Sequence, residues 1–417
     1  MLTAFKRNYK ILIFVSIWLS YFKIIGTSFK IVDLLALFNI LLFMILIIHR
    51  KKYMKDPIML ILGVLSFSSF LMSYIYFKNM FIGARYVSSL MLPLYLTFLY
   101  PDIISKLRKF ILKNIRFALA LCFIFGFLQT NVSFFWTDGE SFHFGLIGRA
   151  TGLFANSAHN GVYIFMLIYT YIVVKKKINR EDYLFLLMGY LGLFFSETRA
   201  VIGIAILSIP IYFFHQLSYF SIRDQKLLPK RLFIMVFLFF ILPLSLVSYI
   251  YWDTVYYVYE ALSSVFKLRI NAPPNFEVNY SSEYCFNMQG EEYLDQSLGH
   301  RLERLIFIYH TVLDGHYWYG HGLGRCIGGG ADNQLARITN DLGLIGLILN
   351  ICLYIAIFFV AIKRRNFRYI YLLLTILYLG LFYDILYLQL SVVCIGIILI
   401  YLRNDNEPEI INYPKAE

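Results

Sequence analysis

Long apolar runs recur along almost the whole of this chain, and they constrain its fold more than any other feature. The runs are 15 to 22 residues long and alternate with short basic segments. A helix that crosses a bilayer needs about 20 apolar residues. Helices this apolar leave too few polar faces to meet water, and 59% of the residues are hydrophobic, where soluble domains average about 45–50%. The sequence therefore predicts an all-α polytopic membrane protein.

We expect about twelve transmembrane helices in this chain. Their expected ranges are 10–25, 31–48, 57–77, 81–100, 116–135, 155–174, 183–198, 200–217, 232–251, 337–361, 369–384 and 387–402. The chain then divides into membrane helices 1–9 with short loops at 1–251, one large external loop subdomain at 252–336, membrane helices 10–12 at 337–402, and a short cytoplasmic tail at 403–417.

Basic residues predict the orientation of these helices. If the N-terminus is inside, the cytoplasmic segments hold 26 of the 38 Lys and Arg residues, an excess typical of cytoplasmic loops. Both termini are then cytoplasmic, and the 252–336 loop is external. This insertion pattern accounts for most of the net charge of +13. Because the basic clusters alternate with apolar spans and form no single patch, we expect no nucleic-acid partner.

The remaining twelve cations, on the external side, comprise eight Arg and four Lys. Arg offers a planar fork of donors that suits phosphate, whereas Lys is a point charge. Three of these arginines are candidates for binding an anion, namely Arg85, Arg149 and Arg199. Each has a structural alternative: Arg85 and Arg149 could reach for lipid headgroups, and Arg199 could pair with Glu197 at the membrane boundary.

The external loop carries further candidates. His300, Arg301 and Arg304 are spaced by three and four residues in an amphipathic stretch, so they share a face of an expected helix. Two forked cations there could hold a diphosphate, with a solvated helix face as the alternative. The glycine-rich "GHGLGRCIGGG" does not match a P-loop, so we expect no nucleotide. The scattered histidines lack metal-ligand spacing, so we expect no metal and no cofactor.

Asp332 and Asn333 directly precede the expected span at 337–361. The helix dipole favours a carboxylate at this end, so Asp332 could be a plain N-cap. It could also act as a general base or orient a sugar hydroxyl. Elsewhere in the external loop, Cys285 and Cys326 could form a disulfide in an oxidising compartment, and the sequence favours neither outcome.

Four motifs, taken in order, resemble the O-antigen ligase and polymerase superfamily. They are "RATGLFANSAHNG", "SETRAVIG", "GHRLER" followed by "YGHGLG", and "DNQLARITNDLGLIGL". Members of this superfamily are bacterial inner-membrane glycosyltransferases that use undecaprenyl-diphosphate-linked glycans. The resemblance covers roughly residues 145–350. It implies a GT-C-like helical membrane domain with one large periplasmic loop and catalysis without a metal.

The resemblance also suggests roles for individual residues. Arg199 and Arg301 would bind the diphosphate, with Arg149 and Arg304 assisting, although "ANSAHNG" lacks the proline usual after Arg149. Asp332 stands where ligases that act on lipid A–core look as though they need His. That departure favours a Wzy-type polymerase and leaves His300 and Asp332 as candidate bases. Arg85 and Asn333 are further candidate substrate ligands at the same face.

The expected function is polymerisation of undecaprenyl-diphosphate-linked oligosaccharide repeat units on the periplasmic face of the bacterial inner membrane. Expected partners are those lipid-linked oligosaccharides, membrane lipid and, as a family expectation, a chain-length-regulating co-polymerase. Two alternatives stay open. One is a ligase that transfers polymer to lipid A–core. The other is a flippase or transporter, which should place its charges near the membrane midplane and show repeat-related halves.

Overall fold

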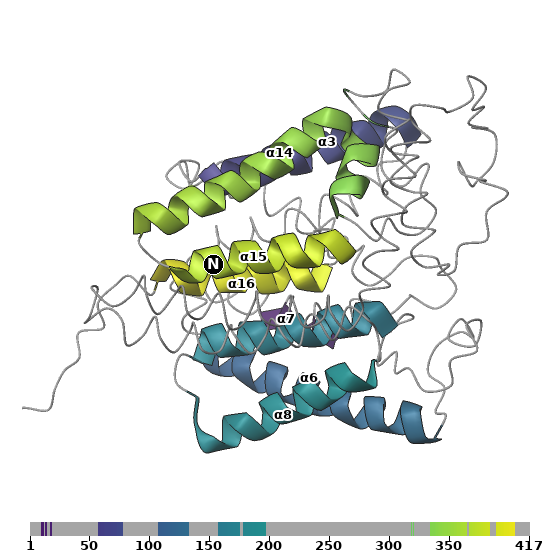
Figure 1. Ribbon diagram of the computed structural model, residues 1–417, viewed down its shortest axis with the longest axis vertical. Coiled ribbons are helices and arrows are strands. Elements are labelled where there is room, and N and C mark those ends of the chain that lie inside the picture. The colour runs from purple at the N-terminus through teal and green to yellow at the C-terminus, as the bar shows by residue number, and fades with distance from the viewer. Residues whose placement is uncertain are drawn as a thin grey trace, which may run out of the picture.

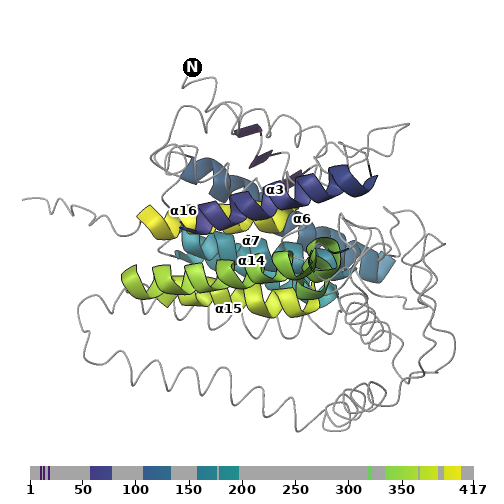
Figure 2. The same cartoon turned by 90° about the horizontal axis from the view of Figure 1, so that it is seen from above.

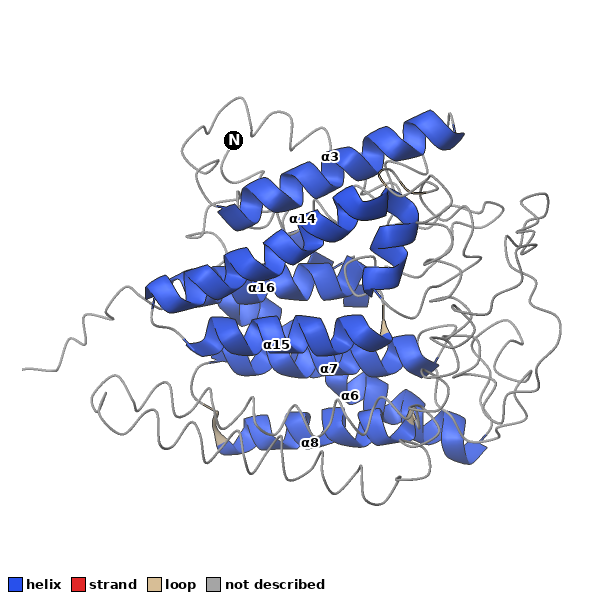
Figure 3. Cartoon of the chain, turned by 45° about the horizontal axis from the view of Figure 1, so that its top comes forward, coloured by secondary structure: helices blue, strands red, loops and turns tan. Residues whose placement is uncertain are grey.

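The computed structural model describes residues 10–11, 13–14, 17–18, 57–77, 107–132, 157–175, 178–196, 318, 320, 334–364, 367–383 and 389–404. Within these residues every regular element is a helix and there is no strand (Figure 3). The prediction of an all-α fold is therefore confirmed for the described part of the chain. The expected spans 31–48, 81–100, 200–217 and 232–251, the loop except for residues 318, 320 and 334–336, and the tail beyond residue 404 lie outside it.

Seven helices are described, and they lie roughly parallel or antiparallel to one another (Figure 1). They are α3 (Pro57–Phe77), α6 (Arg108–Val132), α7 (Ser157–Lys175), α8 (Arg180–Phe195), α14 (Gln334–Arg364), α15 (Phe367–Phe382) and α16 (Gln389–Asn404). All but α6 begin within three residues of an expected span. Helix α6 begins eight residues before the expected start at 116, because the basic segment ahead of that span is itself helical.

Two of the described helices are long and apolar enough to cross a membrane, at Arg108–Gln129 in α6 and Asp341–Lys363 in α14. Helices α3 and α14 also expose apolar stripes with a spacing of three or four residues. The stripe on α3 comprises Leu60, Val64, Phe67 and Leu71, and that on α14 comprises Ile348, Ile351, Ile355, Phe358 and Ile362. Water does not favour stripes of this size, whereas lipid accepts them.

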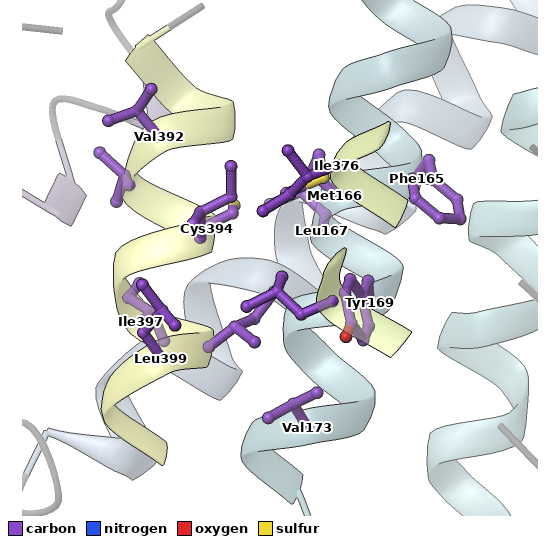
Figure 4. Packing of buried hydrophobic residues seen from close by; sticks show 14 of the residues in the cluster. Phe165, Met166, Leu167, Tyr169, Val173, Ile376, Val392, Cys394, Ile397 and Leu399 are labelled. Atoms are coloured by element: carbon purple, nitrogen blue, oxygen red, sulfur yellow. The ribbon is translucent and has the colours of Figure 1, made fainter. Parts of the chain in front are cut away.

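Helix α7 lies at the centre of the described bundle, between α16 on one side and α6 and α8 on the other (Figure 1). In the view from above, α3 and α14 lie nearest to the viewer, in front of α7 (Figure 2). Every residue from Val162 to Val174 is buried. Figure 4 shows Met166 and Val173 of α7 on the side of α16, where Cys394 and Ile397 lie. A helix that is apolar on all sides is buried in protein or in a membrane, and α7 is enclosed by its neighbouring helices.

Glycines allow α8 to pack closely against its two neighbours. A Cβ on Gly189 would lie 3.0 Å from side-chain atoms of Leu119 in α6 and Ile168 in α7. A Cβ on Gly192 would lie 3.5 Å from the backbone carbonyl carbon of Cys122. Small residues at helix contacts are typical of membrane bundles, where van der Waals packing drives association.

Helix α14 is not one continuous helix, as the expected span at 337–361 implied. Its segments 334–342 and 344–364 are joined at Gly343, whose φ of 64° and ψ of −155° are not helical. Glycine adopts this conformation because it has no Cβ to clash with the neighbouring backbone. We call residues 334–342 the half-helix and residues 344–364 the long segment of α14.

Candidate functional site

The residues proposed from the sequence as the site lie outside the described residues. They are Arg85, Arg149, Arg199, His300, Arg301, Arg304, Asp332 and Asn333. Three of their motifs, however, run directly into described helices. Asn160 belongs to the motif of Arg149, Ser196 precedes Arg199 by three residues, and Gln334 follows Asn333. These three residues therefore mark the places where the described helices adjoin the segments that carry the predicted site residues.

Asn160 and Ser196 lie at the same level of the bundle. Helices α7 and α8 are antiparallel, because Lys175 contacts Asp182, Ile168 faces Gly189 and Ile164 faces Gly192. Both helices advance about 1.5 Å per residue, so continuing these pairings by one turn brings position 160 level with position 196. Both residues are fully buried.

Gln334 lies at this level too. Tyr169 of α7 forms an edge contact with Tyr371 of α15, with ring centroids 6.3 Å apart. The two helices run in opposite directions (Figure 1), so position 380 of α15 is level with position 160. Side-chain atoms of Gln334 lie 3.6 Å from the place that a Cβ on Gly380 would occupy. We call the end of the bundle marked by Asn160, Ser196 and Gln334 the motif end.

A buried polar cluster holds Gln334 at the motif end. The Gln334 Nε2 amide donates to Asn350 Oδ1 at 3.2 Å and to the Tyr354 hydroxyl at 2.9 Å. Asn350 Nδ2 donates to the same hydroxyl at 3.1 Å. Gln334 and Asn350 are fully buried and Tyr354 is 9% exposed. The cluster therefore joins the first residue of the half-helix to the long segment of α14.

The half-helix also contains a charged pair. Arg337 Nε lies 3.7 Å from Asp341 Oδ2, one helical turn away, and the Asp341 side chain is 1% exposed. Arg337 is one of the eight arginines expected on the external side, and this pairing gives it a structural role within the half-helix.

Residues Trp318 and Gly320 of the expected loop lie against the corner at Gly343. The Ile345 N–H donates to the Trp318 carbonyl at 3.4 Å. A Cβ on Gly343 would be only 2.6 Å from Gly320 N and from the Trp318 carbonyl. The backbone of this loop segment therefore fills the corner, and one N–H at the start of the long segment bonds to the protein itself.

The opposite end of α6, α7 and α8 carries a second charged cluster. Arg116 and Tyr171 both donate to the carboxylate of Asp182, and Arg116 Nε also donates to the Tyr171 hydroxyl at 2.7 Å. Lys175 Nζ lies 3.2 Å from the other carboxylate oxygen. Asp182 is fully buried, so it ties three helices together where the sequence predicts the cytoplasmic side.

These contacts change the acidity of Asp182, which lies just outside the expected span at 183–198. Burial alone would raise the pKa of the carboxyl. Hydrogen bonds from Tyr171, the Asn179 backbone N–H, Lys175 and Arg116 outweigh burial and lower the pKa of Asp182 below its ordinary value. The carboxylate is therefore ionised at neutral pH and is neutralised by the two cations. This cluster has the character of a structural anchor.

Cysteine and metal chemistry can be assessed only for the described residues. There, Cys122, Cys352 and Cys394 are free thiols, whereas Cys285 and Cys326 lie outside. No group of three or more His, Cys, Asp or Glu residues within the described helices is placed to hold a metal ion.

Sequence reasoning did not identify the Gln334, Asn350 and Tyr354 cluster. One signal was present, because Asn350 is a polar residue inside an otherwise apolar run, and such residues usually face a partner in the protein. The sequence does not show that Gln334 is the partner of Asn350, because the two residues come together only through the corner at Gly343. A continuous helix would carry Gln334 and Tyr354 about 30 Å apart.

Comparison of the chain with protein-family models found no match, and comparison with curated proteins found none either.

Proposed function

We propose that this protein is an O-antigen polymerase that joins undecaprenyl-diphosphate-linked oligosaccharide repeat units at the periplasmic face of the bacterial inner membrane. The growing chain on the lipid diphosphate is the donor, and a sugar hydroxyl of a new lipid-linked repeat is the acceptor. The proposed architecture has about twelve membrane helices in a GT-C-like arrangement, a periplasmic loop at 252–336, and both termini in the cytoplasm.

One observation carries the proposal: Asn160, Ser196 and Gln334 lie at one level of one packed bundle. Asn160 belongs to the motif of Arg149, and Ser196 and Gln334 lie within three residues of Arg199 and Asp332. The motifs are separated by up to about 190 residues in the sequence, and the fold brings the helix ends beside them to one level. It supports a common site at the motif end, formed by the segments that carry Arg149, Arg199 and Asp332.

The exposed apolar stripes on α3 and α14 support the membrane location. The orientation is supported by the basic residues, because Lys109 and Lys113 of α6 and Arg180 of α8 lie at the end opposite to the motif end. A lipid-linked substrate reaches such a site from the bilayer, with its diphosphate at the membrane boundary.

The chemistry proposed for the site is glycosyl transfer. The acceptor hydroxyl attacks the anomeric carbon of the donor sugar, the bond from that carbon to the diphosphate breaks, and the diphosphate leaves with the electron pair. Arg199 and Arg301 stabilise the negative charge that grows on the diphosphate, with help from Arg149 and Arg304. Asp332 or His300 accepts the proton of the hydroxyl.

The test replaces Arg199 and Arg301 by Lys, which keeps the charge but removes the forked donor. Chain extension is measured as the ladder of surface polysaccharide on a gel, from cells that carry each variant in place of the wild type. We expect the ladder to shorten in both variants. Arg180→Lys is the matched control, since Arg180 is exposed at the other end of α8. Full-length ladders with Arg199→Lys and Arg301→Lys in inserted protein would refute the diphosphate role.

Deletion of the gene separates the polymerase from its alternatives. A single repeat unit on the core in place of the ladder supports the polymerase. Core alone, with long chains accumulating on the lipid carrier, identifies a ligase. Core alone, with repeat units retained on the cytoplasmic leaflet, identifies a flippase.

The broken helix α14 is the observation that most favours a transporter, because discontinuous helices form ion and substrate sites in that class. In those sites the freed helix termini face the ligand. Here the Trp318 carbonyl already accepts a hydrogen bond from the Ile345 N–H, and the backbone of residues 318–320 lies against the corner. This arrangement favours a structural break, so we retain the polymerase as the proposal.

A further inference from the structure

The strongest feature without a role in the proposed reaction is the buried cluster of Gln334, Asn350 and Tyr354. Gln334 is the first residue of the half-helix, and its two hydrogen-bond partners belong to the long segment of α14. We propose that Gln334 is a positioning residue, which fixes the half-helix and thereby the adjoining Asp332 and Asn333. This inference rests on the proposed function.

The distances show that α14 folds back on itself at Gly343. In a straight helix, residues 16 and 20 positions apart are separated by about 24 and 30 Å. Gln334 instead donates to Asn350 at 3.2 Å and to Tyr354 at 2.9 Å. A Cβ on Gly346 would lie 3.0 Å from the carbonyl oxygen of Ile338 and 2.4 Å from Leu342 Cβ. The half-helix therefore packs closely along the first turns of the long segment.

The half-helix is held at both of its ends. At the corner, the backbone of Trp318 and Gly320 lies against Gly343. At the far end, Gln334 donates to Asn350 and Tyr354 of the long segment and packs against α15 near Gly380. Thr339, in between, donates to the Leu335 carbonyl of its own half-helix at 2.7 Å. Loss of the Gln334 hydrogen bonds would therefore weaken the hold on the far end and allow it to tilt about the corner.

The amide of Gln334 supplies both donors that this geometry needs. Both N–H groups of Nε2 are used, one for the Asn350 carbonyl oxygen and one for the Tyr354 hydroxyl. Leu has no donor, and Glu, when ionised, accepts hydrogen bonds only. Because the cluster is buried, removing one partner leaves the others unsatisfied in an apolar surrounding.

A small tilt of the half-helix is enough to affect catalysis. Nine residues of helix extend about 13 Å, so a 10° tilt about Gly343 moves Gln334 by roughly 2 Å. Asp332 is two residues further, and its Cα lies within about 7.6 Å of the Gln334 Cα through the covalent chain. Misplacement by about 1 Å can slow an enzyme by about 100-fold. On this proposal, the cluster acts on Asp332 through the half-helix and the two intervening peptide bonds.

The experiment compares Tyr354→Phe with Thr339→Val in the full-length protein. Each substitution removes one buried hydroxyl from α14 and nearly preserves side-chain volume. Only Tyr354→Phe removes a contact that joins the half-helix to the long segment; the Thr339 bond stays within the half-helix. Chain extension is read from the polysaccharide ladder at equal amounts of inserted protein. Hydrogen–deuterium exchange of the peptide covering residues 330–342 is measured on the purified protein.

We expect Tyr354→Phe to reduce chain extension at least tenfold and to accelerate exchange across residues 330–342. Thr339→Val should leave chain extension within about twofold of the wild type, even if it lowers the thermal midpoint as much as Tyr354→Phe does. A purely structural role predicts instead that ladder loss follows the fall in thermal midpoint in both variants, and that result would overturn the proposal.

Two further results would also overturn it. Accelerated exchange with an intact ladder would show that the half-helix does not position the reactive residues. Unchanged exchange in both Tyr354→Phe and Gln334→Leu would show that the cluster does not hold the half-helix. A normal ladder in the deletion strain would refute the proposed function itself, and the exchange data would still decide whether the cluster holds the half-helix.

Discussion

Replacement of Gly343 by Ala should destabilise the protein by about 3 kcal/mol. At φ 64° and ψ −155°, this residue occupies a region that is nearly restricted to glycine, and any other residue is penalised there by about 1–3 kcal/mol. The new Cβ would also lie 2.6 Å from backbone atoms of Trp318 and Gly320. That segment would have to move, which would break the bond from Ile345 N–H to the Trp318 carbonyl at a cost of about 1 kcal/mol.

Gly63→Ala is the matched control for this prediction, because it adds the same methyl group elsewhere. Gly63 lies inside α3, with no atom within 4 Å of the position that its Cβ would take. Ala should be more favourable there by about 0.5–1 kcal/mol, since glycine in a helix interior is unfavourable.

The assay is the midpoint of heat-induced unfolding of the purified protein in one detergent. Gly343→Ala should lower the midpoint and Gly63→Ala should raise it slightly. A midpoint for Gly343→Ala equal to or above that of Gly63→Ala would refute the description of the corner. It would mean that residues 318–320 do not lie against Gly343, or that the corner relaxes without loss.

Three further outcomes follow from the packing of α6, α7 and α8. Asp182→Asn should lower the thermal midpoint at pH 7, because Arg116 and Lys175 would face a neutral amide. The difference between this variant and the wild type should shrink as the pH falls below about 4. A carboxyl with a lowered folded pKa stabilises the protein above its ordinary pKa, and that stability is lost as the pH falls through the folded value; a difference that stays constant from pH 7 to pH 3 would contradict this. Gly126→Ala should destabilise by about 1–3 kcal/mol, because its Cβ would lie 2.9 Å from a ring carbon of Phe195, and a midpoint no lower than that of the wild type would count against this packing.

Hydropathy was sufficient to predict most of the described helices, because each is an apolar run bounded by polar residues. The run at 57–77 matches α3 at both ends. Hydropathy was less successful at α6, where Lys109 and Lys113 lowered the mean hydropathy of the window ahead of residue 116. The helix begins at Arg108 because Ile111 and Ile115 bury one face of this stretch while the lysines stay exposed. An average over a window cannot separate the two faces of a helix.

The corner in α14 could not be predicted from hydropathy for a related reason. The run through "NDLGLIGLILN" is apolar whether or not the chain turns within it. What decides the turn is the approach of Trp318 and Gly320 to Gly343, a contact between residues more than twenty positions apart. Gly343 and Gly346 were visible in the sequence, but glycine is also common in straight membrane helices.

The candidate site was predicted as a set of motifs, and the fold bears on it only through the helix ends. Asn160, Ser196 and Gln334 lie at one level of the bundle, and the grouping of the motif residues into one site stays a prediction. The roles of Arg199, Arg301 and Asp332 stay predictions that the substitutions above address. Their chemistry depends on side-chain directions, and spacing along a sequence cannot provide these across separate helices.

The fold-back in α14 has a consequence for how this protein is made. The residues that form the corner and the polar cluster all lie between Trp318 and Tyr354, so they leave the ribosome before α15 and α16 do. Contacts between residues close in sequence form early because little loop entropy opposes them. The half-helix can therefore take its place during synthesis, and α15 then packs against it through Gly380. A nascent chain released after Tyr354 would already contain the described residues of the corner and of the polar cluster.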